Sequence, residues 1–475
     1  MKTYLVGAVF LATTALSGTA IAGSGDNYSG FPVTLKGYSG AKTTSVAYTG
    51  QIARHLLHES LKKLAGKGNG QPNEALKNQM LAYYSGKDAG RDIVAPASKG
   101  AFVFKQSKVD EISKKKELAG KTYKGTISSW PNAMTGPEVV KFWIEKASSA
   151  NKGYDAVNGY NYPQLISKFI MGAVFYNQIA DNYLDEKLNA DTKPNNKPYK
   201  KGAYYTGKEH SWDEGFGYFG AAAHTASLTA KQSYEIAKLG SKSKDPKATM
   251  MLADHNKDGK IDYYSEMTYA LAYYASSYDK GGKTNYLQTI NTAFLDGRKL
   301  IAIANGEALT DVQRDELKGY AATVKSNLEM VLAESVFKYA GSVYKDIQAL
   351  KAVMEANGDE AKTLKKYVKH WGELKGFAMA LQVGGKDLGE TATRLNRMIG
   401  VGPLMPNSSQ VVDIDKNGNY VKDQGSGYDE YALHMLKVQK LMVEKFGVKA
   451  RNNDQLASIK DLTDKLGGSN SAEND

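Results

Sequence analysis

The stretch NYPQLISKFIMGAVFYNQIADNYL, residues 161–184, decides the fold class of this chain. Asn161 can cap a helix, and Pro163 suits a first helical turn, where the backbone N–H has no internal partner. Apolar side chains then recur at helical spacing: Leu165, Ile166, Phe169, Ile170, Ala173 and Val174. This stripe predicts a long helix with one face buried in a core.

Similar patterns recur on both sides of this stretch and predict further helices. The expected ranges are 51–64, 137–146, 208–239, 265–277, 284–304, 310–340 with another helix to 356, 362–381, 390–399, 428–446 and 454–466. Thr310 and Gln313 match a capping box. No segment shows the strict alternation of a half-buried strand. We therefore expect an all-α fold, one multi-helix bundle or two packed helical bundles, with irregular loops that carry EF-hand-like acidic motifs.

The first residues predict a Sec-type signal peptide over residues 1–22. Lys2 supplies the positive charge, residues 4–16 are mostly apolar, and Ala20-Ile21-Ala22 matches a cleavage site. The apolar run is shorter than the roughly 20 residues that span a bilayer. The chain has no cysteine, so a lipobox is excluded. We expect a periplasmic or secreted protein that is not an integral membrane protein.

The rest of the chain divides into three expected regions. Residues 23–45 are rich in Gly, Ser and Tyr and predict a flexible leader. Residues 46–467 hold the helical patterns and predict one large helical domain, and residues 468–475 form a polar tail.

Composition excludes several classes of function. The absence of cysteine removes disulfides, thiolate metal sites and thiol nucleophiles. The net charge is +12, but the lysines are scattered, which favours a solvated surface over attachment to an anionic envelope. No nucleic-acid-binding module is present, so we expect no nucleic-acid partner.

Two segments place histidine beside carboxylates at helical spacing. His210 precedes Asp213 and Glu214, and His370 precedes Glu373. Side chains three or four residues apart share one face of a helix. Imidazole and carboxylate from two facing helices can hold iron or zinc in a bundle, and the alternative is a buried polar network. We expect the two segments to converge in one cavity.

Three other histidines lie at suggestive positions. His55 and His58 are three apart and indicate either a two-histidine clip or, more simply, a solvated helix face. His224 follows His210 by about four helical turns, so a continuous helix would place both on one face.

The sharpest local motif is DHNKDGKID, residues 254–262. Its oxygen ligands, its glycine at position six and its apolar residue at position eight match a calcium-binding EF-hand loop. Position twelve is Ser265 rather than glutamate, and Glu266 follows at thirteen. The expected calcium ligands are Asp254, Asn256, Asp258, Lys260 and Glu266. The alternative is a polar turn between helices. Residues 413–419 contain half of the same motif.

Several segments resemble a bacterial family, domain of unknown function 4856. They are Val46–Gln51, Lys168–Ala173, Glu209–Tyr218, Asp254–Glu266 and His370–Gln382. That family is in turn similar to imelysin-like (peptidase M75-like) envelope proteins, which are helical and carry a Gly-x-His-x-x-Glu motif. His370 and Glu373 match its second half, but Val368 stands in place of the glycine. The resemblance implies a helical imelysin-like domain over residues 46–467 and an association with iron acquisition.

These observations favour an exported, non-catalytic metal-binding envelope protein linked to iron or other cation acquisition. Its expected partners are a metal ion and other envelope proteins. One alternative is a metal-dependent hydrolase of the peptidase kind, although the His-Glu-x-x-His and Gly-x-Ser-x-Gly motifs are absent. The other alternative is a surface protein, structural or adhesive, that calcium stabilises.

Overall fold

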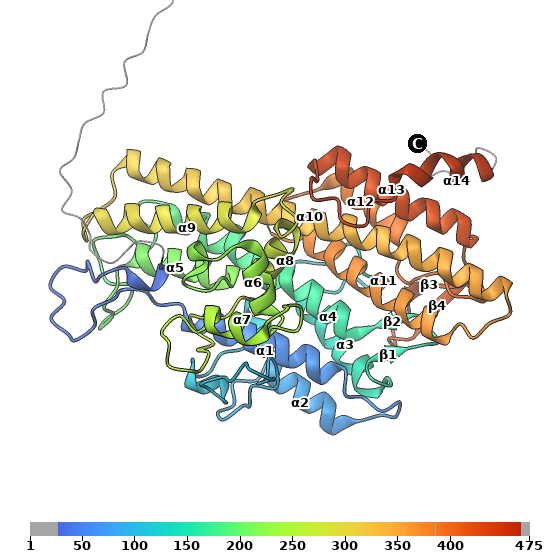
Figure 1. Cartoon of the computed structure of the whole chain (residues 1–475), viewed down its shortest axis with the longest axis horizontal. Helices are drawn as coiled ribbons and strands as arrows, with labels where there is room; N and C mark the ends of the chain where they lie inside the picture. The colour runs from blue at the N-terminus through green and yellow to red at the C-terminus, as the bar shows by residue number, and fades with distance from the viewer. Residues whose placement is uncertain (1–26, 385, 467–475) are drawn as a thin grey trace, which may run out of the picture.

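A computed structural model describes residues 27–384 and 386–466 (Figure 1). The expected signal peptide and polar tail therefore lie outside the described residues. Helices dominate the fold, as the apolar stripes predict. Their bounds are α1 Thr49–Ala65, α2 Glu74–Tyr84, α3 Gly136–Ser149, α4 Tyr162–Ile170, α5 Gly207–Phe219, α6 Ala230–Ala237, α7 Pro246–Ala253, α8 Ala270–Asp279, α9 Tyr286–Ile303, α10 Asp311–Glu355, α11 Ala361–Leu381, α12 Gly389–Ile399, α13 Tyr428–Phe446 and α14 Ile459–Lys465.

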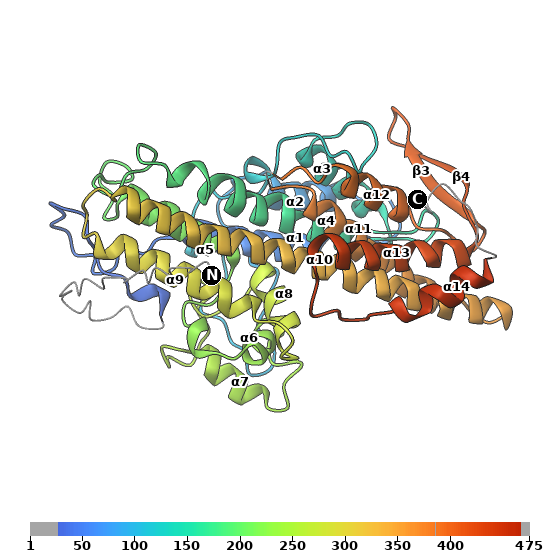
Figure 2. The ribbon, with the colours of Figure 1, turned by 90° about the horizontal axis from the view of Figure 1, so that it is seen from above.

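The long helix α10 runs through most of the length of the molecule (Figures 1 and 2). Its 45 residues correspond to about 68 Å at 1.5 Å per residue. It packs against α9 near one end and against α11 and α13 near the other. Helix α4 lies between α1 and α11, and it continues as π-helix through Met171–Tyr176 and Gln178–Tyr183. The residues of the apolar stripe on α4 are fully buried, which confirms the core face predicted for this helix.

Sequence patterns predicted two helices in place of α10, with a break near Ala340, but the helix is continuous. Gly341 lies inside it and serves close packing. A Cβ atom at Gly341 would lie 1.9 Å from the carbonyl oxygen of Asn453, so only glycine allows that loop to approach. The capping box at its start is confirmed, because the N–H of Thr310 donates to Oε1 of Gln313 at 2.9 Å.

The helix expected over 208–239 is instead two helices, α5 and α6, joined by a loop. Gly220 ends α5 with a left-handed φ of 80°, a common helix stop for which glycine has no Cβ penalty. The alanines that follow are buried, and their apolar character made the loop resemble a helix in the sequence. Helix α7 also occupies part of a stretch expected to be loop.

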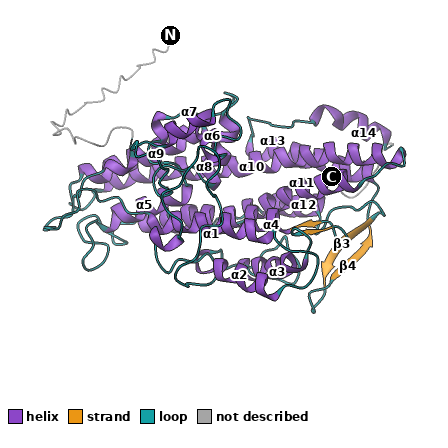
Figure 3. Cartoon of the chain, turned by 60° about the horizontal axis from the view of Figure 1, so that its bottom comes forward, coloured by secondary structure: helices purple, strands orange, loops and turns teal. Residues whose placement is uncertain are grey.

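The described residues contain two small antiparallel sheets (Figure 3). Strands β1 Tyr154–Asp155 and β2 Tyr160–Asn161 form the first. Strands β3 Ser409–Ile414 and β4 Tyr420–Gln424 form a hairpin where only irregular structure was expected. The second acidic motif makes its turn, in which Oδ1 of Asp415 accepts from the N–H of Asn417 and Asn419, each at 2.8 Å.

Both ends of residues 27–45, expected to be a flexible leader, pack against the rest of the fold, whereas most of residues 36–43 are exposed. Tyr28 and Phe31 are fully buried, and the ring of Tyr28 stacks on Phe216 of α5 with 3.6 Å between centroids. Their aromatic surface is removed from water, which favours the ordered state. No helix in the described part of the chain combines the length and apolarity that crossing a membrane requires.

Candidate functional site

The first histidine segment sits on α5 among aromatic rings. Nε2 of His210 lies 3.7 Å from Oε1 of Glu214, so these two side chains share a helix face as predicted. The rings of Tyr199 and Tyr205 pack against the imidazole at centroid distances of 4.3 and 4.4 Å. Burial, only partly offset by Glu214, lowers the pKa of His210.

Asp213 does not join His210, because it belongs to a buried ion network. Its Oδ1 accepts from Nε of Arg298 at 2.9 Å and from the hydroxyl of Tyr28 at 3.0 Å. Its Oδ2 accepts from the backbone N–H of Ala47 at 3.1 Å. Arg298 also lies 3.2 Å from Oε1 of Glu209, and all three charged side chains are fully buried. This network ties α9 and the N-terminal segment to α5.

The second histidine segment lies on α11 and has different partners. Nδ1 of His370 lies 2.5 Å from Oδ2 of Asp346 on α10, and Glu373 faces a cavity one turn further along. That cavity is lined by His370 and Glu373 but by none of the α5 residues. Within residues 27–384 and 386–466, no three His, Asp or Glu side chains are grouped as metal ligands. The structure therefore does not bring the two segments together.

His55 and His58 form neither a clip nor a solvated face. Both imidazoles are fully buried, and their Nε2 atoms lie 3.0 Å from the carbonyl oxygens of Gly217 and Ser167. Burial lowers the pKa of His55 to about 3 and that of His58 to about 4. They are core histidines that join α1 to the neighbouring helices. His224 lies beyond the end of α5, and so does not continue the face of His210.

The carboxylates of the acidic loop accept hydrogen bonds from the backbone of the same loop. Asp254 accepts from the N–H of Asp258 at 3.1 Å and of Gly259 at 2.9 Å. Glu266 reaches back into the loop, where it accepts from the N–H of Asn256 at 3.1 Å and of Asp262 at 2.7 Å. Both oxygens of Glu266 thus accept hydrogen bonds from the backbone of the loop.

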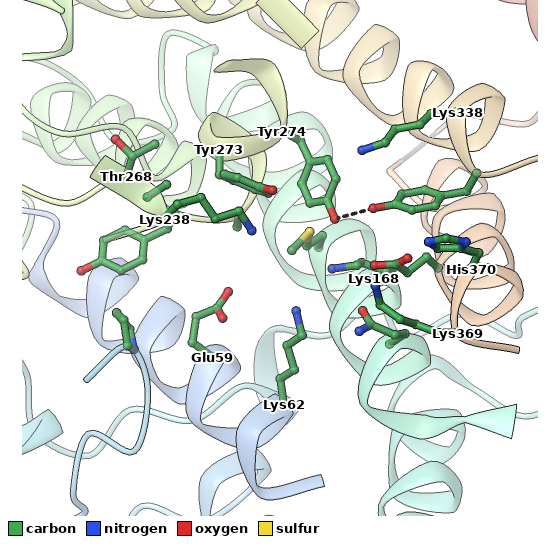
Figure 4. A pocket seen from close by; sticks show the side chains of 18 of the residues that line it. Glu59, Lys62, Lys168, Lys238, Thr268, Tyr273, Tyr274, Lys338, Lys369 and His370 are labelled. Carbon is green, nitrogen blue, oxygen red and sulfur yellow. Dashed lines mark hydrogen bonds between the residues drawn. The ribbon is translucent and has the colours of Figure 1, made fainter. Parts of the chain in front are cut away.

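The most distinctive site was not singled out in the sequence. A cavity of about 470 Å³ lies where α1, α4, α6, α8, α10 and α11 meet, and it is lined by lysines from four of these helices and by the lysine that follows α6 (Figure 4). They are Lys62, Lys168, Lys238, Lys338 and Lys369. Two carboxylates, Glu59 and Glu373, also face the cavity, as do several tyrosines. Lysines therefore outnumber carboxylates in its wall.

Lys168 is the most deeply placed of these lysines, with 2% of its surface exposed. Its Nζ lies over the rings of Tyr274 and Phe377 at 5.3 and 5.8 Å from their centroids. Burial lowers its pKa well below the usual range, and neighbouring Lys62 lowers it further, against the opposing effects of Glu373 and Glu59. Glu373 is 6% exposed, and its Oε2 is buried without a hydrogen-bond partner.

Lys338, which also lines the cavity, is a second lysine with a lowered pKa. The pKa of Lys338 is lowered by burial and by nearby Lys238 and Lys369, among others, although Glu373 opposes the shift. Its ammonium group lies 4.9 Å from the ring centroid of Tyr339. The lysines of the cavity therefore repel one another in a partly desolvated space.

One signal for this cavity was present in the sequence. Lys168 interrupts the apolar stripe of α4 on the side that becomes buried. A lysine rarely occupies such a position without a partner. The other lysines are separated by long stretches of chain, so no local spacing could connect them.

The comparisons with known proteins agree with the family resemblance. Residues 38–256 match the family model described as "Domain of unknown function (DUF4856)". The matched region contributes Lys62, Lys168 and Lys238 to the cavity, whereas Lys338 and Lys369 follow it in the chain. No curated protein and no solved structure matches the chain. This match over residues 38–256 supports the resemblance of the chain to the DUF4856 family.

Proposed function

We propose that this chain is a binding protein for a small anionic solute, which it holds in the lysine-lined cavity. The observation that carries the proposal is the excess of lysines over carboxylates in the wall of one cavity, where the most buried lysine has no ion pair with any described residue. Together with the expected signal peptide, this gives an extracytoplasmic solute-binding protein. The family model is described only as a domain of unknown function, so the match neither supports nor contradicts this proposal.

The physical argument concerns the cost of burying charge. An ammonium group removed from water without a partner is strongly destabilised, so it either loses its proton or recruits an anion. Five lysines from separate segments of the chain around one cavity offer a carboxylate or phosphate several charge-assisted hydrogen bonds. Tyrosine rings on the same wall can pack against the non-polar part of an organic anion.

Citrate and inorganic phosphate are suitable first probes for calorimetry and thermal unfolding. We expect citrate to bind with a dissociation constant that rises with salt and to raise the melting temperature. Lys338→Gln should weaken binding about tenfold or more, because a hydrogen bond to a charged group contributes about 1.5–3 kcal/mol. The matched control is Lys460→Gln, an exposed lysine on α14 that pairs with Asp464. Equal loss in both variants, or no binding of either anion, would reject the proposal.

Calcium binding at the acidic loop is a second candidate function, favoured by the position of Glu266. This side chain folds back onto the loop although the usual position twelve is serine, and calcium would take its two oxygens from the N–H groups of Asn256 and Asp262. Asp254, Asn256 and Asp258 supply further oxygen atoms, and Lys260 can contribute its carbonyl. The role of calcium would be to stabilise the loop between α7 and α8.

We expect calcium to raise the free energy of unfolding by about 2.7 kcal/mol at 100 times its dissociation constant. A chelator should reverse this increase, and Asp258→Ala should lose most of it. The matched control is Asp415→Ala, which removes a carboxylate from the turn of the β3–β4 hairpin. If the chelator leaves the unfolding curve unchanged, the loop is only a polar turn.

Iron or zinc binding through the two histidine segments is not carried into this proposal. Asp213 pairs with Arg298, and His370 pairs with Asp346. The proposed solute site therefore depends on lysines, and its test requires no transition metal.

A further inference from the structure

The amine of Lys168 stands apart from the other ammonium groups of the molecule. It projects from α4 into the cavity and is surrounded by aromatic rings, by Lys62 and by two glutamates (Figure 4). Within the described part of the chain, no carboxylate oxygen lies within 4.0 Å of its Nζ and no atom accepts a hydrogen bond from it. An amine with carboxylates nearby but none in contact leaves space beside it for a ligand atom.

We propose that Lys168 is a nucleophile that forms an imine with the carbonyl group of an anionic ligand held in this cavity. The proposal rests on the proposed function, because the remaining lysines bind the acidic group of the ligand while Lys168 meets its carbonyl carbon. The ligand class is thus an organic acid or phosphate ester that also carries an aldehyde or ketone.

The environment supplies what such a reaction needs. A lysine amine attacks only in its neutral form, and proteins obtain that form by desolvation or by an adjacent cation. Both conditions are present, since burial and Lys62 together lower the pKa of Lys168. Glu59 and Glu373 face the same amine and act in the opposite direction, but burial outweighs them.

The reaction balances without any oxidant or reductant. The lone pair of Nζ forms a bond to the carbonyl carbon as the carbon–oxygen π bond breaks, and one proton passes from the nitrogen to the alkoxide oxygen, which gives a carbinolamine. Glu373, whose Oε2 has no hydrogen-bond partner among the described residues, can take the second proton from the nitrogen and give it to the departing hydroxyl group. Water leaves, and the nitrogen–carbon double bond of the imine remains.

Lys375 on α11 provides an internal comparison. Burial lowers its pKa to about 7, so it is also an unusual lysine. However, its Nζ donates to the carbonyl oxygen of Gly400 at 2.7 Å, and it does not line the cavity. A depressed pKa alone therefore does not distinguish Lys168; its open contact with the cavity does.

Pyridoxal 5′-phosphate tests this proposal, because it combines an aldehyde with a phosphate. The full chain is incubated with the reagent at low concentration, reduced with borohydride, and analysed by intact mass and peptide mapping. We expect one adduct per chain on Lys168, formed at least tenfold faster than on any other lysine and slowed by citrate. Lys168→Arg and Lys168→Met should each lose it, and pyridoxine 5′-phosphate, which has no aldehyde, should give none.

The outcomes separate this proposal from the proposed function. If citrate binds but the adducts spread over surface lysines or fall on Lys62, the imine proposal is rejected and anion binding stands. If citrate does not bind and no lysine is labelled selectively, both are rejected. Mapping of the wild-type chain decides the matter even where a Lys168 variant fails to fold.

Discussion

Replacing Arg298 with methionine should lower the free energy of unfolding by about 3–5 kcal/mol, the cost of leaving buried charges without their partner. Arg298 pairs with both Glu209 and Asp213, and all three side chains are fully buried. Methionine has a similar length but cannot donate to either carboxylate. Urea unfolding monitored by circular dichroism measures the loss directly, and the N-terminal segment that contacts Asp213 should become susceptible to protease.

Two companion variants sharpen this experiment. Lys299→Met removes the neighbouring cation on α9, which is partly exposed and pairs with Asp296 at 3.4 Å, and should cost less than about 1 kcal/mol. Adding Glu209→Gln and Asp213→Asn to Arg298→Met should recover part of the lost stability, because no unpaired charge remains. A loss below 1 kcal/mol for Arg298→Met would show that the network is not a principal support of the fold.

Stability should also fall steeply as the pH drops from about 6.5 toward 4, because three imidazoles are buried in their neutral form. Burial is the main cause in each case, and it lowers the pKa of His55 to about 3 and those of His58 and His224 to about 4. In the unfolded chain these groups titrate near 6.5. The unfolded state therefore binds more protons over this range, so the contribution is complete above pH 6.5 and is lost on acidification.

One proton corresponds to about 1.4 kcal/mol per pH unit, so the three imidazoles contribute about 4 kcal/mol per pH unit near pH 5. Asp213, whose pKa burial raises to about 6, opposes this with about one proton, which leaves a net slope of about 3 kcal/mol per pH unit. Urea unfolding at a series of pH values measures it. His55→Gln and His224→Gln keep a donor near the carbonyl oxygens of Gly217 and Leu252, and each should remove about one proton from the slope. Variants with the same slope as the wild type would contradict this account.

Local sequence patterns determined the helical class of the fold. Apolar side chains at helical spacing, such as those of residues 161–184, bury one face whatever the rest of the chain does. Capping residues such as Thr310 act on N–H groups within one turn, so they were also readable from the sequence. The same holds for the acidic loop, whose hydrogen bonds join residues 254–266 to one another.

Errors arose where a distant contact decided a local conformation. The sequence predicted a helix end near residue 340, but the helix continues, and the loop at Asn453 packs against its Gly341. The segment containing Tyr28 looked flexible, but the aromatic core of α5 covers it. The helical spacing correctly placed His210 beside Glu214. It could not show that Asp213, the residue before Glu214, forms an ion pair with Arg298.

The candidate site most clearly separates what the sequence determined from what only the tertiary structure decided. The sequence alone determined that Lys168 interrupts an apolar stripe and must be accommodated in a core. Only the tertiary structure decided what surrounds it, because Lys62, Lys338 and Lys369 come from helices far apart in the chain. The electrostatic effect of each lysine on its neighbours depends on distance and on exclusion of water, and helix packing sets both.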